Sequence, residues 1–390
     1  MGIPTPTTLD GFTPAWLTAS LRSSGTIGAE ASVDSVEFQI LGTGEGFMGE
    51  LARLTVGYAG GAGPETMIAK IPTQLAQNRA LGKTLGIYER EVRVYADLVP
   101  DLPVPTPAVY AAIYEPNGDE AELTERAEKA EKLPIWALRL LLRRQSTDAD
   151  VPPCALLLED LAADAEVGDQ VAGLSVSRIE AGLRGLARLH AATWNHAGVP
   201  DEHWVLNRGK TPKLGQAFYL NGRKQTRALL ADRLSAHSLA LLWDVKRSGV
   251  ERIRRLYADA PLCLLHGDYR PDNLFFDDTG ELVSMIDWQG ANLGPAAFEV
   301  FYFLVSSLEV EDPDRLVDGL LGVYHDELVT NGVVDYPFER LRHHYAESLL
   351  VGIHGLPLLA ANIDFGDGRG AELMARTGAR LDGLLRRASL

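Results

Sequence analysis

The chain has 390 residues, which at about 150 residues per domain is enough for two or three domains or two lobes. Hydrophobic residues make up 46% of it and charged residues 23%, an ordinary globular composition that excludes a wholly disordered chain and a fibrous repeat. The formal net charge of −16 disfavours nucleic acid as a partner, because a surface that acidic repels phosphate backbones.

Localisation signals point to the cytoplasm. The N-terminus has no basic start followed by an apolar run, so we predict no secretory signal. The most apolar stretch, residues 349–363, contains a proline and polar residues, which makes it too broken to span a bilayer. The two cysteines, Cys154 and Cys263, fit a reducing compartment as small buried residues. We therefore expect a cytoplasmic protein that does not bind membranes.

The first part of the chain favours strands. Thr13 and Pro14 are typical of an N-cap and a first helical residue. Alternating apolar residues and turn-forming Gly and Pro then indicate short strands with one helix among them. In order, we predict a short helix from Pro14, strands over 32–41, 47–58 and 66–71, a helix over 83–98 and a strand over 108–113.

The second part favours helices. Residues 115–150 are rich in charge and predict a partly helical surface insertion, for which a solvated face without function is the simplest interpretation. Residues 154–159 predict a buried strand, and helical patterns follow over 179–195, 217–260 and 313–390, with a strand pair between the last two. We expect an α+β protein of two lobes, 1–153 and 154–390.

A glycine-rich segment lies between the first two predicted strands. Gly44, Gly46 and Gly49 form G-x-G-x-x-G. The dinucleotide-binding form of this motif opens a helix, whereas a position between two strands is typical of the hairpin that covers phosphates in kinases. Glycine allows backbone N–H groups to approach phosphate oxygens closely. An ordinary hairpin turn is the alternative.

Lys70 lies on the apolar strand over 66–71. A lysine there is costly unless it is paired or faces solvent. In a kinase it would contact ATP phosphates and be oriented by a carboxylate of the next helix. Of Glu89 and Glu91 on that helix, we choose Glu91, because Glu89 adjoins the apolar stripe residue Tyr88. A solvated lysine at the end of a strand is the alternative.

The strongest signal follows residue 264. His266, Asp268 and Asn273 lie in a loop between apolar segments, and Asp287 follows the next one. A kinase needs a carboxylate near the attacking hydroxyl, an amide oxygen five residues later and a carboxylate on the next strand, the last two for Mg²⁺. Asp268, Asn273 and Asp287 have these positions.

With these residues the chain resembles the aminoglycoside phosphotransferase and choline kinase-like superfamily, whose members share the protein-kinase fold but phosphorylate small molecules. Within it, the chain is most similar to the ecdysteroid kinase-like branch and its bacterial relatives. The segments that carry this likeness are 44–50, 69–72, 157–161 and 287–289, and the resemblance runs from about Phe12 to the C-terminus.

The resemblance implies a role for each matching residue. Asp268 would accept or orient the proton of the substrate hydroxyl. Asn273 and Asp287 would bind Mg²⁺, and Lys70, with Glu91, would hold ATP. The segment from Glu159 to Leu161 would form the interlobe hinge that meets adenine, and His266 would brace its loop. Many relatives have Asp where this chain has Glu299, which leaves the role of that position open.

These features together predict an ATP- and Mg²⁺-dependent kinase that phosphorylates a hydroxyl of a small molecule. The alternative is an inactive nucleotide-binding pseudokinase with a regulatory role. The chain has no zincin, serine-hydrolase or P-loop motif. The acceptor stays open among lipophilic alcohols, aminoglycosides, sugars and choline-like amines.

Overall fold

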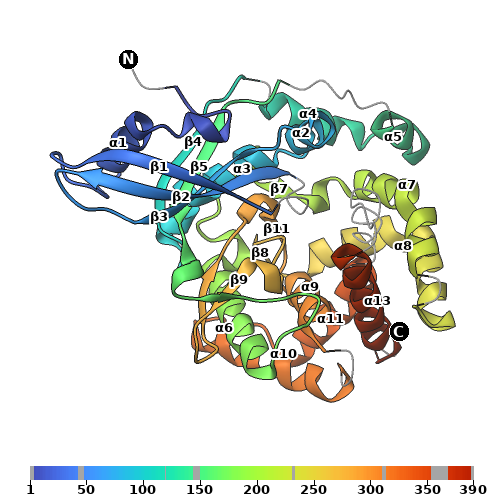
Figure 1. The fold of residues 1–390 in the computed structure, drawn as a ribbon. Helices are drawn as coiled ribbons and strands as arrows, with labels where there is room; N and C mark the ends of the chain where they lie inside the picture. Colours follow the sequence, from blue (N-terminus) through green and yellow to red (C-terminus); the bar gives the residue numbers. More distant parts are fainter. Residues whose placement is uncertain are drawn as a thin grey trace.

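A computed structural model of the chain describes residues 4–42, 48–118, 120–143, 150–230, 233–309, 313–352 and 368–387. In this part of the chain, the N-terminal lobe is built on an antiparallel sheet with the strand order β1-β2-β3-β5-β4 (Figure 1). Its strands are β1 (Ser32–Leu41), β2 (Gly49–Ala59), β3 (Thr66–Pro72), β4 (Val109–Tyr114) and β5 (Cys154–Glu159). The sheet thus includes the strand that begins just after the predicted boundary at residue 153.

Strand alternation decides which way the lysine of β3 points. Met67, Ala69 and Ile71 are buried on one face, where they join a cluster with Phe12 and Trp16 beside helix α1 (Pro14–Ser23). Since successive side chains on a strand point to opposite faces, Lys70 faces the other side. Thr13 caps α1 as predicted: its side chain accepts a hydrogen bond from the Trp16 N–H.

The helix predicted over 83–98 is wrong as a single element. The structure has α2 (Ala76–Thr84) and α3 (Ile87–Arg93), followed by a π-helical turn over Val94–Leu98. The break lies at Gly86, whose φ of +63° belongs to the left-handed region. Glycine adopts that conformation without the steric cost of a Cβ, so the chain turns there before α3 begins.

The charged insertion is partly helical, as predicted, and contains α4 (Glu120–Ala130) and α5 (Ile135–Leu142). It is not only a solvated face. Leu138 of α5 is buried, and Arg139 donates a hydrogen bond to the side chain of Asn221 in the C-terminal lobe. Figure 1 shows both helices above the helices of that lobe.

The C-terminal lobe is mainly helical, with two small sheets at its centre, ordered β10-β9-β6 and β7-β11-β8. Its helices are α6 (Val176–Ala192), α7 (Pro212–Leu230), α8 (Ala236–Asp259), α9 (Ala296–Ser307), α10 (Pro313–Thr330), α11 (Phe338–Gly352) and α13 (Arg369–Arg387). Its strands are β6 (Glu166–Val167), β7 (Leu206–Asn207), β8 (Leu262–Leu265), β9 (Leu274–Phe276), β10 (Leu282–Met285) and β11 (Asn292–Pro295).

Short 3-10 turns connect these elements, at Leu9–Gly11, Val99–Asp101, Leu161–Ala163, Trp194–His196, Arg208–Lys210, Pro271–Asn273 and Trp288–Gly290. Among the described residues, no helix has both the length and the apolar character needed to cross a bilayer. Cys154 and Cys263 are buried and unpaired with each other, as expected of small core residues.

Candidate active site

Lys70 lies between two carboxylates from distant parts of the chain. Its Nζ is 2.6 Å from Glu91 Oε1 and 2.8 Å from Asp287 Oδ1. Glu91 is therefore the helix partner of Lys70, as the sequence predicted. Glu89, on the same helix, instead contacts His203 Nε2, at 3.1 Å. The three-residue cluster joins β3, α3 and the segment after β10.

This cluster is held by charge in a largely buried place. Burial disfavours the ammonium, but Asp287 and Glu91 outweigh it and raise the pKa of Lys70. Burial alone would raise the pKa of Asp287, yet the charge and hydrogen bond of Lys70 lower it. Burial raises the pKa of Glu91, and Lys70 offsets only part of that rise, so the pKa stands at about 7. One ammonium thus faces two carboxylates, and the Asp287 carboxylate is the one that stays charged most easily.

Of the three predicted loop glycines, Gly49 is described, and Gly44 and Gly46 lie outside the described residues. Gly49 is the first residue of β2. A Cβ at this position would stand 3.1 Å from Lys70 Cε and 3.3 Å from the Ile71 carbonyl oxygen, tighter than most Cβ contacts. The absence of a Cβ at Gly49 therefore leaves room for the Lys70 side chain against β2.

Asp268 lies in the loop between β8 and β9, where both of its carboxylate oxygens accept hydrogen bonds. Tyr302 donates its hydroxyl to Oδ1 at 2.6 Å. Arg270 Nε and Asn273 Nδ2 each donate to Oδ2 at 3.1 Å. Asn273 Nδ2 also donates to the Asp268 carbonyl at 2.9 Å, so the amide fixes both ends of this residue. The carboxylate is oriented before any substrate arrives.

Asn273 and Asp287 are brought together by the pairing of β9 with β10. The Ile286 N–H donates to the Asn273 carbonyl at 3.0 Å, which places Asp287 beside the loop between β8 and β9. Asp287 has a φ of +68°, an uncommon conformation for a residue with a Cβ. Since the Asn273 amide nitrogen faces Asp268, its oxygen is left for another partner.

These two side chains fit a magnesium site. Amide and carboxylate oxygens are hard donors, and Mg²⁺ in phosphoryl-transfer sites uses one or two protein ligands besides waters and phosphates. No group of three or more His, Cys, Asp or Glu side chains suited to a metal occurs among the described residues.

Glu299 of α9 holds the backbone of the loop between β8 and β9. Its carboxylate is 1% exposed and accepts the N–H groups of His266, at 2.9 Å, and Gly267, at 2.5 Å. His190 Nε2 lies 3.2 Å from the same carboxylate and Nδ1 is hydrogen-bonded to Tyr324. His190 is thus a core histidine. The role of Glu299, open at the sequence level, is to position the loop.

Gly267 and His266 complete this support. The φ of Gly267 is +81°, and a Cβ there would collide with the Gly290 carbonyl. His266 is fully buried, and its Nε2 is hydrogen-bonded to the Ile286 carbonyl at 2.9 Å. It therefore braces the loop against the segment that carries Asp287, in agreement with the sequence-based expectation.

Two residues at Asp268 were missed by sequence reasoning. The sequence analysis gives no role to Tyr302 or Arg270. Both contact the carboxylate, and Arg270 NH1 also binds Asp272 Oδ2 at 2.7 Å. Tyr302 comes from α9, 34 residues beyond Asp268, so no motif spacing marks it. One signal was available, since it lies three residues after Glu299, on one helical face.

The predicted hinge follows β5. Glu159 ends that strand, where its carboxylate accepts the Ala108 N–H at 2.9 Å, and Leu161 begins a 3-10 turn. Between them, Asp160 forms an ion pair of 2.6 Å with Arg53 of β2. The segment thus connects the sheet to the C-terminal lobe; its contact with adenine stays a prediction.

Comparison with known proteins agrees with this arrangement. The profile of the ecdysteroid kinase-like family matches residues 43–332. The choline kinase of Cryptosporidium parvum Iowa II has a similar fold, with a TM-score of 0.50, 12% identity, and coverage of 90% of this chain and 88% of that one. A Plasmodium vivax ethanolamine kinase matches with a TM-score of 0.44, 12% identity, and coverage of 91% and 85%. No curated protein sequence matches the chain.

The likeness to the choline kinase shows the fold alone: an N-terminal lobe built on a sheet and a helical C-terminal lobe, as in the protein kinases. The family profile covers most of the chain, including Lys70, Glu91, Asp268, Asn273 and Asp287. This protein has a protein-kinase-like fold and belongs to the ecdysteroid kinase-like family.

Proposed function

We propose that this protein is an ATP- and Mg²⁺-dependent kinase that transfers the γ-phosphoryl group to a hydroxyl of a small molecule. One observation carries the proposal. Asp268, held at both oxygens, lies in one site with the Lys70–Glu91–Asp287 cluster, and the Ile286–Asn273 backbone hydrogen bond connects the two groups. Positioning and charge neutralisation are the main sources of rate in phosphoryl transfer, so such a site suits the chemistry.

Each side chain has a task in the proposed reaction. Lys70, oriented by Glu91, holds the phosphates of ATP. Asp268 orients the acceptor hydroxyl. The hydroxyl would donate its hydrogen bond to Asp268 Oδ1, the oxygen that also accepts from Tyr302. Asn273 and Asp287 would hold Mg²⁺, which neutralises phosphate charge when bound.

The transfer balances without another reactant. The acceptor oxygen forms a bond to the γ-phosphorus as the bond from that phosphorus to the β–γ bridging oxygen breaks. The hydroxyl proton passes to Asp268, and ADP leaves with the electron pair of the broken bond. A regulatory pseudokinase is the less favoured alternative, because it would not need an oriented carboxylate at position 268.

The test is ADP formation against a panel of small alcohols, with Asp268→Asn as the decisive variant. Asn keeps the shape but removes the base, so turnover should fall by about 10² to 10⁴-fold, with unchanged Mg-ATP affinity. Asp277→Asn is the matched control, since Asp277 follows β9 and accepts hydrogen bonds from the N–H groups of Thr279 and Glu281 in its own turn rather than from Arg270. Full turnover in Asp268→Asn would refute the proposal.

A further inference from the structure

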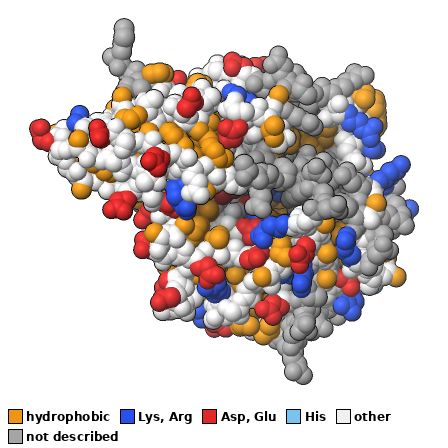
Figure 2. Space-filling view, in the orientation of Figure 1, with side chains coloured by type: hydrophobic (Ala, Val, Ile, Leu, Met, Phe, Trp, Pro, Cys, Tyr) orange, Lys and Arg blue, Asp and Glu red, His pale blue; other side chains and the backbone are white. Residues whose placement is uncertain are grey.

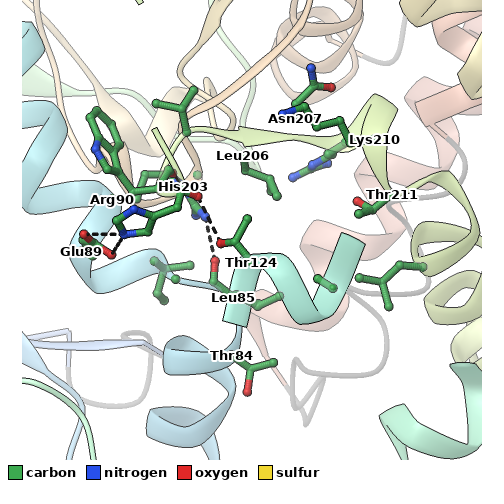
Figure 3. A pocket seen from close by; sticks show the side chains of 18 of the residues that line it. Thr84, Leu85, Glu89, Arg90, Thr124, His203, Leu206, Asn207, Lys210 and Thr211 are labelled. Carbon is green, nitrogen blue, oxygen red and sulfur yellow. Dashed lines mark hydrogen bonds and ion pairs between the residues drawn. The ribbon is translucent and has the colours of Figure 1, made fainter. Parts of the chain in front are cut away.

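A cavity of about 440 Å³ lies between the lobes, beside the first residues of α3. Its walls come from the α2–α3 corner, α4 of the charged insertion, residues 201–215, and helices α7, α8 and α9. Figure 3 shows α4 with Thr124 on one side and the segment with Leu206, Asn207 and Lys210 on another. This volume lies within the range of small-molecule sites, about 300–1,000 Å³.

The lining is mainly apolar. Leu85, Ile87, Leu206, Leu214 and Phe218 are among the side chains that face the space. Polar groups of the walls are engaged with one another: His203 is hydrogen-bonded to Glu89, and Thr124 Oγ1 donates to the His203 carbonyl at 3.2 Å. Other charged residues of the lining are exposed, and these are Glu128, Asp201, Glu202, Arg208 and Lys210. Such a site suits an uncharged molecule that is mainly apolar.

The cavity is separate from the phosphoryl-transfer residues. Lys70, Glu91, Asp268, Asn273 and Asp287 are all described, and none of them lines it. Its lining nevertheless includes residues next to Glu91 and Asp287. Residues 87–90 of α3 line the cavity and directly precede Glu91, and Gln289, another lining residue, donates to Asp287 Oδ2 at 3.3 Å.

Arg90 joins the walls into one unit. It is buried and donates to the carbonyl groups of Trp204 at 3.1 Å, Gln289 at 3.0 Å and Leu85 at 2.8 Å. A molecule in the cavity would therefore contact α3, the 201–205 segment and the segment after Asp287 together. Filling the cavity favours the arrangement in which Glu91 reaches Lys70.

We propose that this cavity binds an uncharged, mainly apolar small molecule at a site separate from the phosphoryl acceptor, and that its occupancy tightens nucleotide binding by holding α3 in place. The ligand site is inferred from the cavity and does not depend on the proposed function. Its coupling to nucleotide rests on the proposed function. Because binding free energies are reciprocal, nucleotide must tighten ligand binding by the same factor.

The chain offers a clean way to fill the cavity. Gly215 on α7 lines it, and a Cβ added there would meet no atom within 4 Å. Gly215→Leu therefore projects a side chain into the space without a backbone clash. Gly319→Leu is the matched control, because Gly319 lies on α10, is exposed, has the same open surroundings and does not line the cavity.

The probe is the neutral dye N-phenyl-1-naphthylamine, titrated by fluorescence into the full chain. We expect saturable binding that is at least about tenfold weaker in Gly215→Leu and unchanged in Gly319→Leu. If Gly215→Leu fails to fold, Phe218→Ala serves instead, since it removes a wall and should also weaken binding. Equal affinity in the wild type and the folded cavity variant would overturn the site.

The coupling is measured with Mg²⁺ and a non-hydrolysable ATP analogue. Saturating dye should raise the affinity for the analogue by about fivefold or more, the lower range of allosteric coupling, and Gly215→Leu should abolish the effect. An unchanged affinity would overturn the coupling. Absence of any nucleotide binding would instead refute the proposed function and leave the dye site standing. An acceptor that displaces the dye would overturn the separation of the two sites.

Discussion

At the scale of single residues, Lys70 shows how one side chain depends on two others. Its ammonium satisfies Glu91 and Asp287 together, at 2.6 and 2.8 Å. Neither carboxylate has another positive charge within ion-pair distance among the described residues. The proposed catalysis and the stability of the fold therefore depend on the same contacts.

Lys70→Ala should lower turnover by at least about 100-fold, because the phosphates lose their cation and Glu91 its partner. Loss of one member of a buried ion pair should also reduce the free energy of unfolding by about 3–5 kcal/mol, with the protein still folded. Steady-state kinetics and urea unfolding measure the two effects. Lys129→Ala, which removes an exposed lysine paired with Glu125, should change neither. Near-normal turnover in Lys70→Ala would mean that another cation binds the phosphates.

The buried His266 predicts a pH effect. Burial lowers the pKa of this imidazole below the ordinary 6.5, although Glu299, Asp268 and Asp287 oppose the shift. The unfolded chain then binds a proton near pH 6.5 that the folded chain does not bind. The free energy of unfolding must therefore fall as the pH drops through this region.

We expect the wild type to lose more stability between pH 7.5 and 5.5 than His266→Asn does. Glu91, with its raised pKa of about 7, has the opposite sign and gains stability on acidification, but it is present in both proteins and cancels in the difference. Urea unfolding at several pH values gives the two curves. Parallel curves would show that His266 does not titrate as argued.

At the scale of elements, α3 is the part on which both proposals depend. It is short, begins after the left-handed Gly86, and is fixed to its surroundings by Arg90. Because Arg90 donates to carbonyl groups from three segments, the position of α3 is set by tertiary contacts more than by helix propensity.

Arg90→Lys should therefore destabilise the protein although it keeps the charge. An ammonium cannot reach three carbonyl groups as a planar guanidinium does, and each buried acceptor left unsatisfied costs about 1–3 kcal/mol. We expect a loss of about 2–4 kcal/mol by urea unfolding and weaker nucleotide binding. Arg93→Lys, one turn on and half-exposed in its pairs with Glu89 and Asp97, should cost less than about 1 kcal/mol. Similar costs for the two variants would contradict this role of Arg90.

At the scale of the whole molecule, the net charge of the protein and the charge of the proposed nucleotide are both negative and repel each other. Figure 2 shows acidic side chains over the strands of the N-terminal lobe, in line with the net charge of −16. Binding of an anionic nucleotide must then depend on local cations, which are Lys70 and the proposed metal ion.

Mg-ATP should consequently stabilise the protein more than ATP with a chelator does. At 100 times the dissociation constant, the stabilisation is about 2.7 kcal/mol, which appears as a rise in melting temperature. Asp287→Ala should abolish the difference between the two conditions, while Asp272→Ala should keep it. Equal stabilisation with and without Mg²⁺ in the wild type would refute the proposal that Asn273 and Asp287 bind the metal.

Local patterns in the sequence were sufficient for much of this protein. Local patterns predicted the strands over 32–41 and 66–71, the second of which carries Lys70, and the structure has both. Motif spacing singled out Asp268, Asn273 and Asp287, and the structure places Asn273 against Asp268. These features depend on near neighbours in the chain, which is why a single sequence shows them. The strand-rich first part and the helix-rich second part predicted two lobes, and the likeness of the motifs to a known family added the protein-kinase fold.

Only the tertiary structure decided what completes the site. Tyr302 and Arg270 bind Asp268, Glu299 holds the loop, and Arg90 joins α3 to two distant segments. The helix over 83–98 was predicted whole because its apolar spacing continues through Gly86, whose left-handed backbone ends it. The cavity beside α3 has walls from both lobes and the insertion. Such contacts join residues far apart in the chain, and no local pattern specifies which of them will meet, because their partners are chosen by packing.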